Sequence, residues 1–244
     1  MSAKKREDGP DGLVVVDKEA GWTSHDVVAK SRGLLGTRKV GHSGTLDPDA
    51  TGILLLGVGR VTRLLKYLTA LPKTYTCEIV FGTETSTLDS SGDITATHEM
   101  SALTFAQVEA AVPELTGDIM QIPPMVSALK IDGKRLHELA REGIEVERAP
   151  RPVTIYRFRV APTADPLVVT AEVECSSGTY VRTLAADLGH ALGGGAHLRE
   201  LRRTAIGSFT LDEAHPLEKV SPEQLLTPAA AMRDQPRVMA TEAE

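Results

Sequence analysis

One short segment of the chain places an acid among residues that restrict the backbone around it. Residues 41–52 read GHSGTLDPDATG, with Asp47 near the middle. The glycines of this segment permit tight turns, and Pro48 fixes the backbone directly after the acid. The apolar run at 53–56 follows at once and is typical of a buried strand. A carboxylate held in a stiff loop against such a strand is suited to act as a nucleophile or a general base.

Two other interpretations of this segment compete with the catalytic one. An isolated Asp-Pro pair usually marks nothing more than a turn. The segment also resembles a calcium-binding loop, because Asp47, Asp49, Thr51 and Gly52 occupy its first, third, fifth and sixth places. The twelfth place, which should be a bidentate Glu, is Val58. The missing carboxylate makes the calcium interpretation the weaker one.

The composition is that of a globular protein, with 41% apolar and 25% charged residues among 244. That length fits one large domain or two small ones. No apolar stretch is long enough for a membrane span and the first residues lack a signal-peptide core, so the sequence predicts a cytoplasmic protein. Cys77 and Cys175 are expected to be buried free thiols, and the His and Cys spacings predict no zinc or other metal site.

The charge is unevenly distributed along the chain. The net charge is −6, but residues 82–118 contain seven acids and no Lys or Arg, and residues 212–244 are also net negative. The bases concentrate in three groups: Arg60, Arg63, Lys66 and Lys73; Lys130, Lys134, Arg135 and Arg141; and Arg199, Arg202 and Arg203. Such groups are either solvated faces or a surface that binds phosphates, and composition leaves both interpretations open.

The hydrophobic periodicity predicts strands and helices in an irregular alternation. Strands are expected at 12–17, 53–56, 73–81, 126–131, 153–160 and 167–175. Helices are expected at 24–35, 60–68, 105–115, 134–142 and 180–192. Because no regular βαβ alternation is present, the sequence predicts an α+β fold with a mixed sheet.

Several long motifs, in order, resemble the TruB family of bacterial tRNA pseudouridine-55 synthases. Besides GHSGTLDPDATG, they are DKEAGWTSHDVV, GVGRVTRLLKYL, KTYTCEIVFGTETSTLD, QIPPMVSALKIDGKRLHELAREG, RPVTIYRF, CSSGTYVRTLAADLG and AHLRELRRTAIGSF. They extend over about residues 12–211, which the resemblance implies is the catalytic domain, between a disordered tail (1–11) and a short acidic C-terminal segment (212–244). The resemblance also implies the pseudouridine synthase fold, an α+β fold with a mixed, largely antiparallel central sheet flanked by helices. The implied activity is the isomerisation of a uridine in the T loop of tRNA, with the target base flipped out of its stack.

The resemblance assigns roles to three catalytic residues. Asp47 is the carboxylate on which glycosidic bond cleavage and C–C rejoining depend, either by attacking ribose C1′ or by assisting removal of the C2′ proton. Arg182 is its basic partner, which keeps the carboxylate ionised and oriented. Tyr75 lies against the target base. Without the resemblance, Arg182 would be read as an exposed helix residue and Tyr75 as core packing. The reaction needs no cofactor and no metal.

The resemblance also implies residues that bind RNA. His42 stacks within the RNA loop, while an isolated loop His would be read as an ordinary surface residue. Other residues expected to contact RNA are Lys18, Tyr180, Arg60, Lys73, Lys130 and Arg202. Lys18 and the segment 21–25 are also expected to support the catalytic loop from beneath. The expected partner is the T arm of tRNA, with no protein partner and a monomeric enzyme.

The sequence departs from the family pattern in three places. Glu19 stands where a proline usually follows the Lys, and His137 stands where a tyrosine is usual. After His215 the remaining residues are too few for the small PUA-type RNA-binding domain found in many relatives. Two alternative functions remain open: a pseudouridine synthase for another RNA, and a non-catalytic RNA-binding or RNA-folding module. The intact set of Asp47, Tyr75 and Arg182 favours catalysis.

Overall fold

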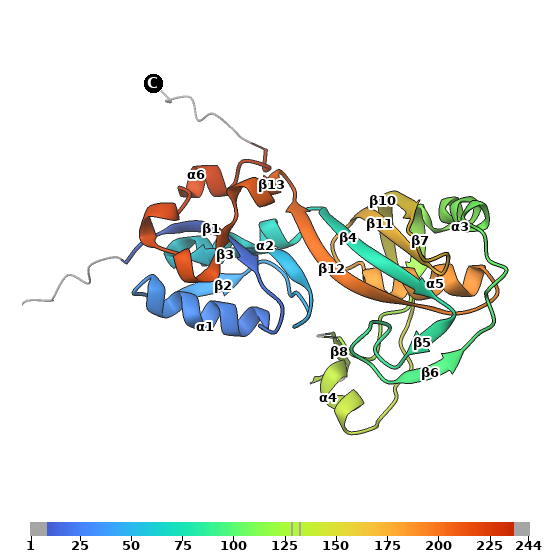
Figure 1. Cartoon of the computed structure of the whole chain (residues 1–244). Coiled ribbons are helices and arrows are strands. Elements are labelled where there is room, and N and C mark those ends of the chain that lie inside the picture. Colours follow the sequence, from blue (N-terminus) through green and yellow to red (C-terminus); the bar gives the residue numbers. More distant parts are fainter. Residues whose placement is uncertain (1–8, 128, 132, 237–244) are drawn as a thin grey trace, which may run out of the picture. The chain divides into compact units, whose positions relative to one another are not determined.

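The computed structural model describes residues 9–127, 129–131 and 133–236. These residues form two compact units (Figure 1). Within the described part, unit 1 contains residues 9–48, 52–71 and 205–236, and unit 2 contains residues 49–51 and 72–204. Unit 1 is therefore built from both ends of the described chain.

Unit 1 is a small sheet with helices on both sides. Its elements are β1 (Gly12–Lys18), α1 (Ser24–Leu34), β2 (Val40–His42), β3 (Thr51–Val58), η1 (Gly59–Leu64), α2 (Leu65–Thr69), β13 (Phe209–Thr210), η3 (Leu211–Glu213), β14 (His215–Pro216), η4 (Leu217–Lys219), η5 (Pro222–Gln224) and α6 (Pro228–Ala231). The strand order is β14-β1-β3, and β2 also pairs with β3. The β1–β14 pair is parallel, and β1–β3 and β2–β3 are antiparallel.

The apolar runs of β1 and β3 are explained by burial on both faces of this sheet. Alternate residues of a strand point to opposite faces. Val14 and Val16 pack on one face with α1 residues such as Val27. Leu13 and Val15 pack on the other face, in a cluster that includes Ala231 of α6. Figure 1 accordingly shows α1 and α6 on opposite sides of the strands.

The C-terminal segment completes the core of unit 1. Leu217 and Val220 are buried in the cluster on the α1 side, and Ala231 is fully buried in the other cluster. The backbone of Leu226 is bonded to that of Leu13 in both directions, at 2.8 and 3.0 Å. The predicted boundary at residue 212 therefore does not coincide with a boundary between compact units. The segment packs its apolar residues against β1 instead of forming a core of its own.

Unit 2 is a larger antiparallel sheet with helices on one face. Its elements are β4 (Lys73–Phe81), β5 (Thr83–Thr85), β6 (Ile94–Thr97), α3 (Phe105–Ala111), η2 (Val112–Leu115), β7 (Gly117–Gln121), β8 (Lys130–Ile131), β9 (Lys134–Arg135), α4 (Leu136–Arg141), β10 (Arg151–Pro162), β11 (Val168–Cys175), α5 (Val181–Ala191) and β12 (Ala196–Ile206). The strand order is β12-β4-β11-β10-β7, and β5–β6 and β8–β9 form separate ribbons.

Helix α5 follows directly from β11 and is buried along most of its length. Buried residues on α5 include Val181, Leu184 and Leu188. The inward residues of β4, Tyr75, Cys77, Ile79 and Phe81, alternate with less buried neighbours. The alternation in β4 is the period-two pattern of a strand with one covered face. The first turn of α5, which carries Arg182, is thus anchored by the hydrophobic packing of the rest of the helix.

The predicted fold class is confirmed, because the described pairs are almost all antiparallel and helices flank the strands. The predicted strands at 12–17, 53–56, 73–81, 153–160 and 167–175 correspond to β1, β3, β4, β10 and β11. The helices predicted at 24–35 and 180–192 correspond to α1 and α5. Thr23 caps α1 through a hydrogen bond from Asp26 N, as a capping box requires.

Four predicted elements differ from the structure in detail. The helix predicted at 105–115 ends at Ala111 and continues as the 3-10 turn η2, because Pro113 cannot continue an α-helix. The helix predicted at 60–68 is a 3-10 helix followed by the short α2. The strand predicted at 126–131 is confined to Lys130–Ile131, and the helix predicted from residue 134 begins at Leu136 because β9 precedes it. The long strand β12 was not predicted.

Three further predictions concern the cysteines, membrane-spanning segments and the N-terminal tail. Cys77 and Cys175 are buried free thiols, as predicted, and burial raises their pKa values to about 12 and about 11. Among the described residues, no helix combines the length and apolar character that crossing a membrane requires. Most of the predicted tail lies outside the described residues, which begin at Gly9.

The packing of the C-terminal segment generates a stability prediction. Replacing Leu217 with Ala removes buried methyl groups from the α1 side of unit 1, so we expect the free energy of unfolding to fall by about 2–5 kcal/mol. Urea unfolding monitored by circular dichroism measures this change. The exposed Lys219→Ala in the same short helix is the control and should stay within about 0.5 kcal/mol of the parent. Equal effects of the two substitutions would contradict a structural role for the segment.

Candidate active site in two parts

Asp47 lies in unit 1, on the loop that joins β2 to β3. The two strands are paired, with His42 opposite Leu56, and Ser43 N donates to Leu55 O at 3.1 Å. The loop therefore leaves and re-enters the same short ribbon. Asp47 is half-buried, whereas Leu46 before it is buried. The buried Leu46 fixes the loop to the core, whereas the carboxylate of Asp47 lies at the edge of this core.

The backbone immediately before Asp47 is held by a serine of α1. Ser24 Oγ accepts a hydrogen bond from Leu46 N at 2.9 Å and donates one to Leu46 O at 3.2 Å. Ser24 is 1% exposed, so water does not compete for these bonds. A single hydroxyl thus satisfies both polar groups of the buried residue that precedes the candidate catalytic acid.

The backbone immediately after Asp47 is held by a buried lysine at the end of β1. Lys18 Nζ donates to Pro48 O at 2.8 Å, to Trp22 O at 2.7 Å and to Glu19 O at 3.0 Å. Gly21 N also donates to Pro48 O, at 3.0 Å. Lys18 is only 1% exposed, and three carbonyl acceptors compensate for the burial of its charge.

This geometry bears on two predictions for Lys18. Its side chain is buried beneath the loop, and its assignment as an RNA contact stays a prediction. The expectation that Lys18 and segment 21–25 support the loop from beneath agrees with the hydrogen bonds of Lys18, Gly21 and Ser24. Glu19 is exposed, and its carbonyl belongs to this arrangement even though a proline is absent.

His42 lies at the end of β2 with its ring held in position. Its Nδ1 accepts a hydrogen bond from Gly44 N at 3.3 Å. Its ring also meets that of His25 edge to face, at a centroid distance of 5.3 Å and an interplanar angle of 79°. The ring is partly exposed. An imidazole oriented in this way presents a flat surface suited to stacking on a base.

Arg182 lies in unit 2, in the first turn of α5, and its guanidinium is surrounded by acceptors. Nη1 donates to Thr87 O at 2.7 Å, Nη2 donates to Val126 O at 2.9 Å, and Nε is 3.4 Å from Asp89 Oδ2. The side chain is 5% exposed. Arg182 is therefore a buried, oriented cation and not an exposed helix residue.

The sequence analysis missed Asp89, the carboxylate that pairs with Arg182. Asp89 Oδ1 accepts from Thr87 Oγ1 at 2.6 Å and from Ser91 N at 3.1 Å, so its own orientation is fixed. The preceding residue, Leu88, has φ 62°, a left-handed conformation that residues other than glycine adopt rarely. Asp89 closes the quoted motif KTYTCEIVFGTETSTLD, but nothing in its spacing indicated an arginine partner ninety residues away.

Tyr180 and Tyr75 occupy well-defined places in the same unit. The backbone of Tyr180 is bonded at both polar groups by Gln121, whose Oε1 accepts from Tyr180 N at 2.8 Å and whose Nε2 donates to Tyr180 O at 3.1 Å. Gln121 is 2% exposed, and the sequence analysis did not single it out. This contact fixes the start of α5 and hence the turn that carries Arg182. Tyr75 is buried on β4, opposite Val173 of β11.

The predicted phosphate-binding bases differ in their burial and in their partners. Arg60 is exposed but forms an ion pair with Asp11, and hydrogen bonds from Arg60 lower the pKa of that carboxyl. Lys73 is buried, and burial followed by repulsion from Arg203 lowers its pKa to about 8, so a surface contact with an RNA stem does not fit its position.

The third predicted group of bases lies on β12, where successive side chains point to opposite faces of the sheet. Arg199 pairs with Glu78 at 2.6 Å, Arg203 is 1% exposed, and Arg202 is half-buried. The side chains of Lys130 and His137 lie outside the described residues. Among the described residues, no group of three or more His, Cys, Asp or Glu is placed to hold a metal ion.

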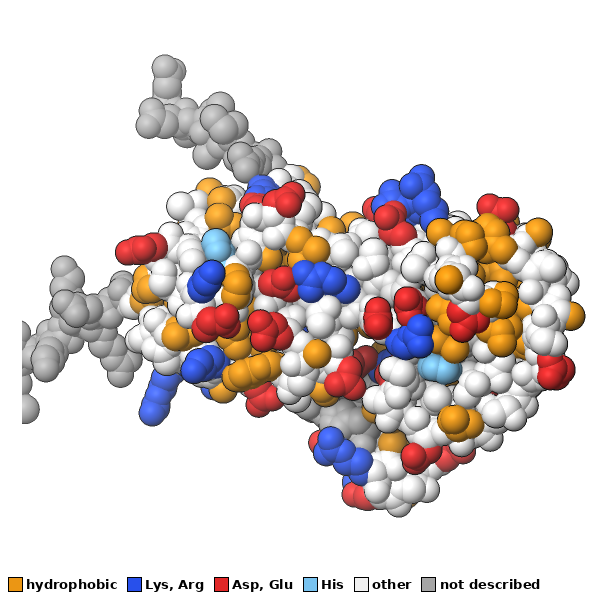
Figure 2. All heavy atoms as spheres, in the orientation of Figure 1, with side chains coloured by type: hydrophobic (Ala, Val, Ile, Leu, Met, Phe, Trp, Pro, Cys, Tyr) orange, Lys and Arg blue, Asp and Glu red, His pale blue; other side chains and the backbone are white. Residues whose placement is uncertain are grey.

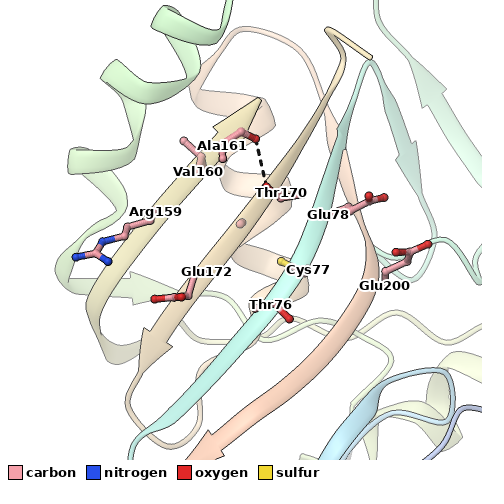
Figure 3. A pocket seen from close by; sticks show the side chains of 10 residues that line it. Thr76, Cys77, Glu78, Arg159, Val160, Ala161, Thr170, Glu172 and Glu200 are labelled. Carbon is pink, nitrogen blue, oxygen red and sulfur yellow. Dashed lines mark hydrogen bonds between the residues drawn. The ribbon is translucent and has the colours of Figure 1, made fainter. Parts of the chain in front are cut away.

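A hollow of about 580 Å³ on the helix-free face of the unit 2 sheet holds none of the predicted site residues. Figure 3 shows its lining side chains from β4, β10, β11 and the neighbouring Glu200. Its acids are largely neutralised, because Glu78 pairs with Arg199, and Glu172 pairs with Arg157 at 2.9 Å. The hollow therefore offers mainly salt-bridged sheet surface, and burial raises the pKa of the Cys77 thiol in its lining to about 12.

The fold and these residues define an α+β protein. Its loop around Asp47 is held by buried hydrogen bonds, and its buried Arg182 is bound by two carbonyls and one carboxylate. The family model of the TruB pseudouridylate synthase N-terminal domain matches residues 32–181. The model of the tRNA pseudouridylate synthase B C-terminal domain matches residues 182–236. The chain belongs to the TruB family of pseudouridylate synthases. It is an enzyme that isomerises uridine to pseudouridine.

Several curated proteins resemble the chain over most of its length. A "tRNA pseudouridine synthase B" of Rhodococcus jostii (strain RHA1) is 56% identical over 216 residues, which cover 87% of this chain and 71% of the relative. Proteins of the same name from Arthrobacter sp. (strain FB24) and Streptomyces coelicolor are 52% and 49% identical, over 87% and 91% of this chain and 71% and 76% of theirs.

Solved structures show the same fold at lower identity. The chain resembles a chain of a crystal structure of a Cbf5-Nop10-Gar1 complex, with a TM-score of 0.66 and 30% identity over 85% of this chain. It also resembles a chain of an H/ACA RNP bound to a substrate RNA containing 2'-deoxyuridine, with a TM-score of 0.63, 25% identity and 89% of this chain covered. The matches span 52% and 58% of those longer chains.

The two hydrogen bonds of Ser24 generate a prediction about positioning. Ser24→Ala frees the backbone of Leu46, so we expect Asp47 to lose its fixed position and kcat to fall by about 10- to 100-fold. Ser31→Ala is a matched control, because Ser31 is a buried serine on the same helix whose hydroxyl has no hydrogen-bond partner in the described structure. Single-turnover assays and thermal unfolding of both variants separate a positioning effect from a stability effect. A Ser24→Ala enzyme with parental kcat would refute the positioning role.

Proposed function

We propose that the chain converts uridine 55 in the T loop of tRNA to pseudouridine. The observation that carries this proposal is the match of both TruB family models, which together extend over residues 32–236. The relatives at about 50% identity are named for tRNA. The clamped loop of Asp47 adds a physical argument, because a purely RNA-binding protein has no need of an acid held on both sides.

The reaction sets the requirements that the site must meet. The N1–C1′ bond of uridine breaks, the base turns, and a C5–C1′ bond forms while the proton at C5 is lost and N1 gains one. Substrate and product have the same atoms and the same oxidation state, so no redox cofactor is required. What the reaction does require is a carboxylate, a fixed geometry and a site that receives a base removed from its stack.

The proposed roles follow from chemistry and from the family resemblance. Asp47 supplies the carboxylate that acts at the sugar. Arg182 stabilises negative charge through a guanidinium that its acceptors hold in one orientation. Tyr75 lies against the target base. Asp89 and Gln121 act as positioning residues, because the first orients the guanidinium and the second fixes the start of α5.

The proposed RNA contacts are fewer than the sequence suggested. His42 and Tyr180 contact the nucleotides of the loop, and Arg60, Lys130 and Arg202 contribute charge toward the stem. Lys18 and Lys73 are left out because both are buried. The enzyme is proposed to act as a monomer in the cytoplasm, where its substrate class is found.

Replacing Asp47 with Asn tests the proposed catalytic acid. The amide keeps the size of the side chain but is a poor nucleophile and cannot act as a base, so we expect turnover to fall by about 10²–10⁴-fold or more with RNA binding retained. Carbodiimide labelling of tRNA measures pseudouridine, and gel shift measures binding.

Asp49→Asn is the matched control for this substitution, because Asp49 is exposed on the same loop. We expect it to retain activity. A large loss with Asp49→Asn that added calcium restores would favour the calcium-loop interpretation, and parental turnover by Asp47→Asn would refute the catalytic assignment.

A second test concerns the part of tRNA that the enzyme recognises. Proteins usually read splayed loop bases and grip A-form stems through shape and phosphates. We therefore expect an isolated T-arm hairpin to be modified with a kcat/KM within about tenfold of that of whole tRNA, and its binding to weaken steeply as salt rises. Measuring both substrates at matched salt decides the question. An inert hairpin would mean that recognition depends on parts of tRNA outside the T arm.

A further inference from the structure

A group of cations at the end of α1 has no part in the site described above. Lys30 and Arg32 lie in the last turns of α1, and Arg38 and Lys39 follow in the loop before β2. All four side chains belong to exposed residues of unit 1. No acid occurs between Asp26 and Asp47 in the sequence. We call these four residues the basic loop, and Figure 2 shows Lys and Arg side chains projecting from the surface around α1.

A hollow of about 660 Å³ lies against the two arginines of the basic loop. Arg32 and Arg38 line it together with Gly33, Gly36 and Thr37. A Cβ added at either glycine would meet no atom within 4 Å, so the backbone between the two arginines is open to a ligand. A surface with two guanidiniums beside an unobstructed backbone suits an anion with several oxygens, such as a phosphate.

Hydrogen bonds within the backbone give the basic loop its shape. Leu35 N donates to Ser31 O at 2.9 Å, and Thr37 N donates to Arg32 O at 3.2 Å. Gly36 has φ 62°, which glycine adopts at no steric cost. Lys39 N donates to Thr37 Oγ1 at 3.3 Å. The loop is therefore formed without its cationic side chains, which remain available for another purpose.

Nearby acids do not neutralise the two arginines. Among the described residues, no carboxylate lies within ion-pair distance of Arg32 or Arg38. Asp11, whose pKa Lys39 helps to lower, forms its ion pair with Arg60. Cations at a helix C-terminus can serve to stabilise the helix dipole, and this explains Arg32. It does not explain Arg38, which lies beyond the helix end at Leu34.

The position of the basic loop in unit 1 indicates the identity of the anion. Lys39 is followed directly by β2, which runs from Val40 to His42 and leads into the loop of Asp47. At about 3.3 Å per residue, Arg38 and His42 are separated by about 13 Å of extended chain. A polyanion whose nucleotide reached His42 would therefore pass within reach of Arg38.

We propose that Arg32 and Arg38 bind backbone phosphates of the RNA substrate next to the nucleotides that His42 contacts. This inference rests on the proposed function and adds a binding surface to it. Because phosphates carry no sequence information, the contact fixes the register of the RNA without selecting bases. It also supplies positive charge that an overall acidic chain needs in order to bind RNA.

The test compares two double variants with the same change in net charge. R32A/R38A removes the basic-loop arginines, and R159A/K219A removes two exposed cations from elsewhere in the chain. We expect R32A/R38A to weaken binding of a T-arm hairpin by about tenfold and to reduce the slope of log K against log salt by about 1.4 to 1.8, as expected for two lost phosphate contacts. In the activity assay, this weaker binding of R32A/R38A should appear as a higher KM. The control pair should bind within about twofold of the parent.

Outcomes that overturn the inference are distinct from those that overturn the proposed function. Equal affinities and equal salt slopes for the two double variants would refute the basic loop as a phosphate site. A lowered unfolding temperature of R32A/R38A with a parental salt slope would also refute it and assign the arginines to helix stability. Failure of the parent protein to form pseudouridine in tRNA or hairpin, measured with the same samples, would instead refute the proposed function.

Discussion

The conformation of the Asp47 loop depends on one buried cation. Lys18 brings an ammonium group beneath the loop, where three carbonyl groups accept its protons, one of them from Pro48 directly after Asp47. A buried charge is costly unless it is fully hydrogen-bonded, so the backbone at Glu19, Trp22 and Pro48 is constrained to stay in place around it. The loop conformation and the burial of Lys18 therefore depend on each other.

Unit 1 as a whole serves to place this cation and the hydroxyl of Ser24. The apolar residues of β1 are buried on both faces of the sheet, and this packing holds the strand that carries Lys18 at its end. Helix α1 begins at Ser24 because Thr23 caps it. Both elements are fixed by cores that include residues from the C-terminal segment, such as Leu217 and Ala231. Residues near the two ends of the described chain thus support the loop of Asp47.

Unit 2 fixes its own candidate residue, Arg182, in a comparable way. The guanidinium of Arg182 is bound by two carbonyls and one carboxylate, and Asp89 is itself held by Thr87 and Ser91. Gln121 fixes the backbone at the start of α5. In both units, buried hydrogen bonds to backbone groups orient a charged side chain, which is the preorganisation that electrostatic catalysis requires. The same principle does not apply to the basic loop, whose cations are exposed and suited to a mobile polyanion.

The sequence alone determined the elements with regular hydrophobic patterns and the motif that names the family. The alternation of β4, the apolar runs of β1 and β3, and the cap of α1 are local signals, so they could be predicted without the fold. The long strand β12 could not, because its charged residues and the positive φ of Glu200 interrupt any alternation. Its place beside β4 comes from long-range pairing.

Only the tertiary structure decided what individual charges do. The sequence did not show that Lys18, Lys73 and Arg203 are buried, and Asp89 became relevant only because the fold brings it to Arg182. A residue type states which charge is present, whereas its pKa, exposure and partners depend on groups far away in the chain. One of the three carbonyls around Lys18, that of Pro48, comes from a separate loop, and no local pattern records that contact. For this reason the sequence singled out the motif around Asp47, while the residues that support this motif emerged only from the fold.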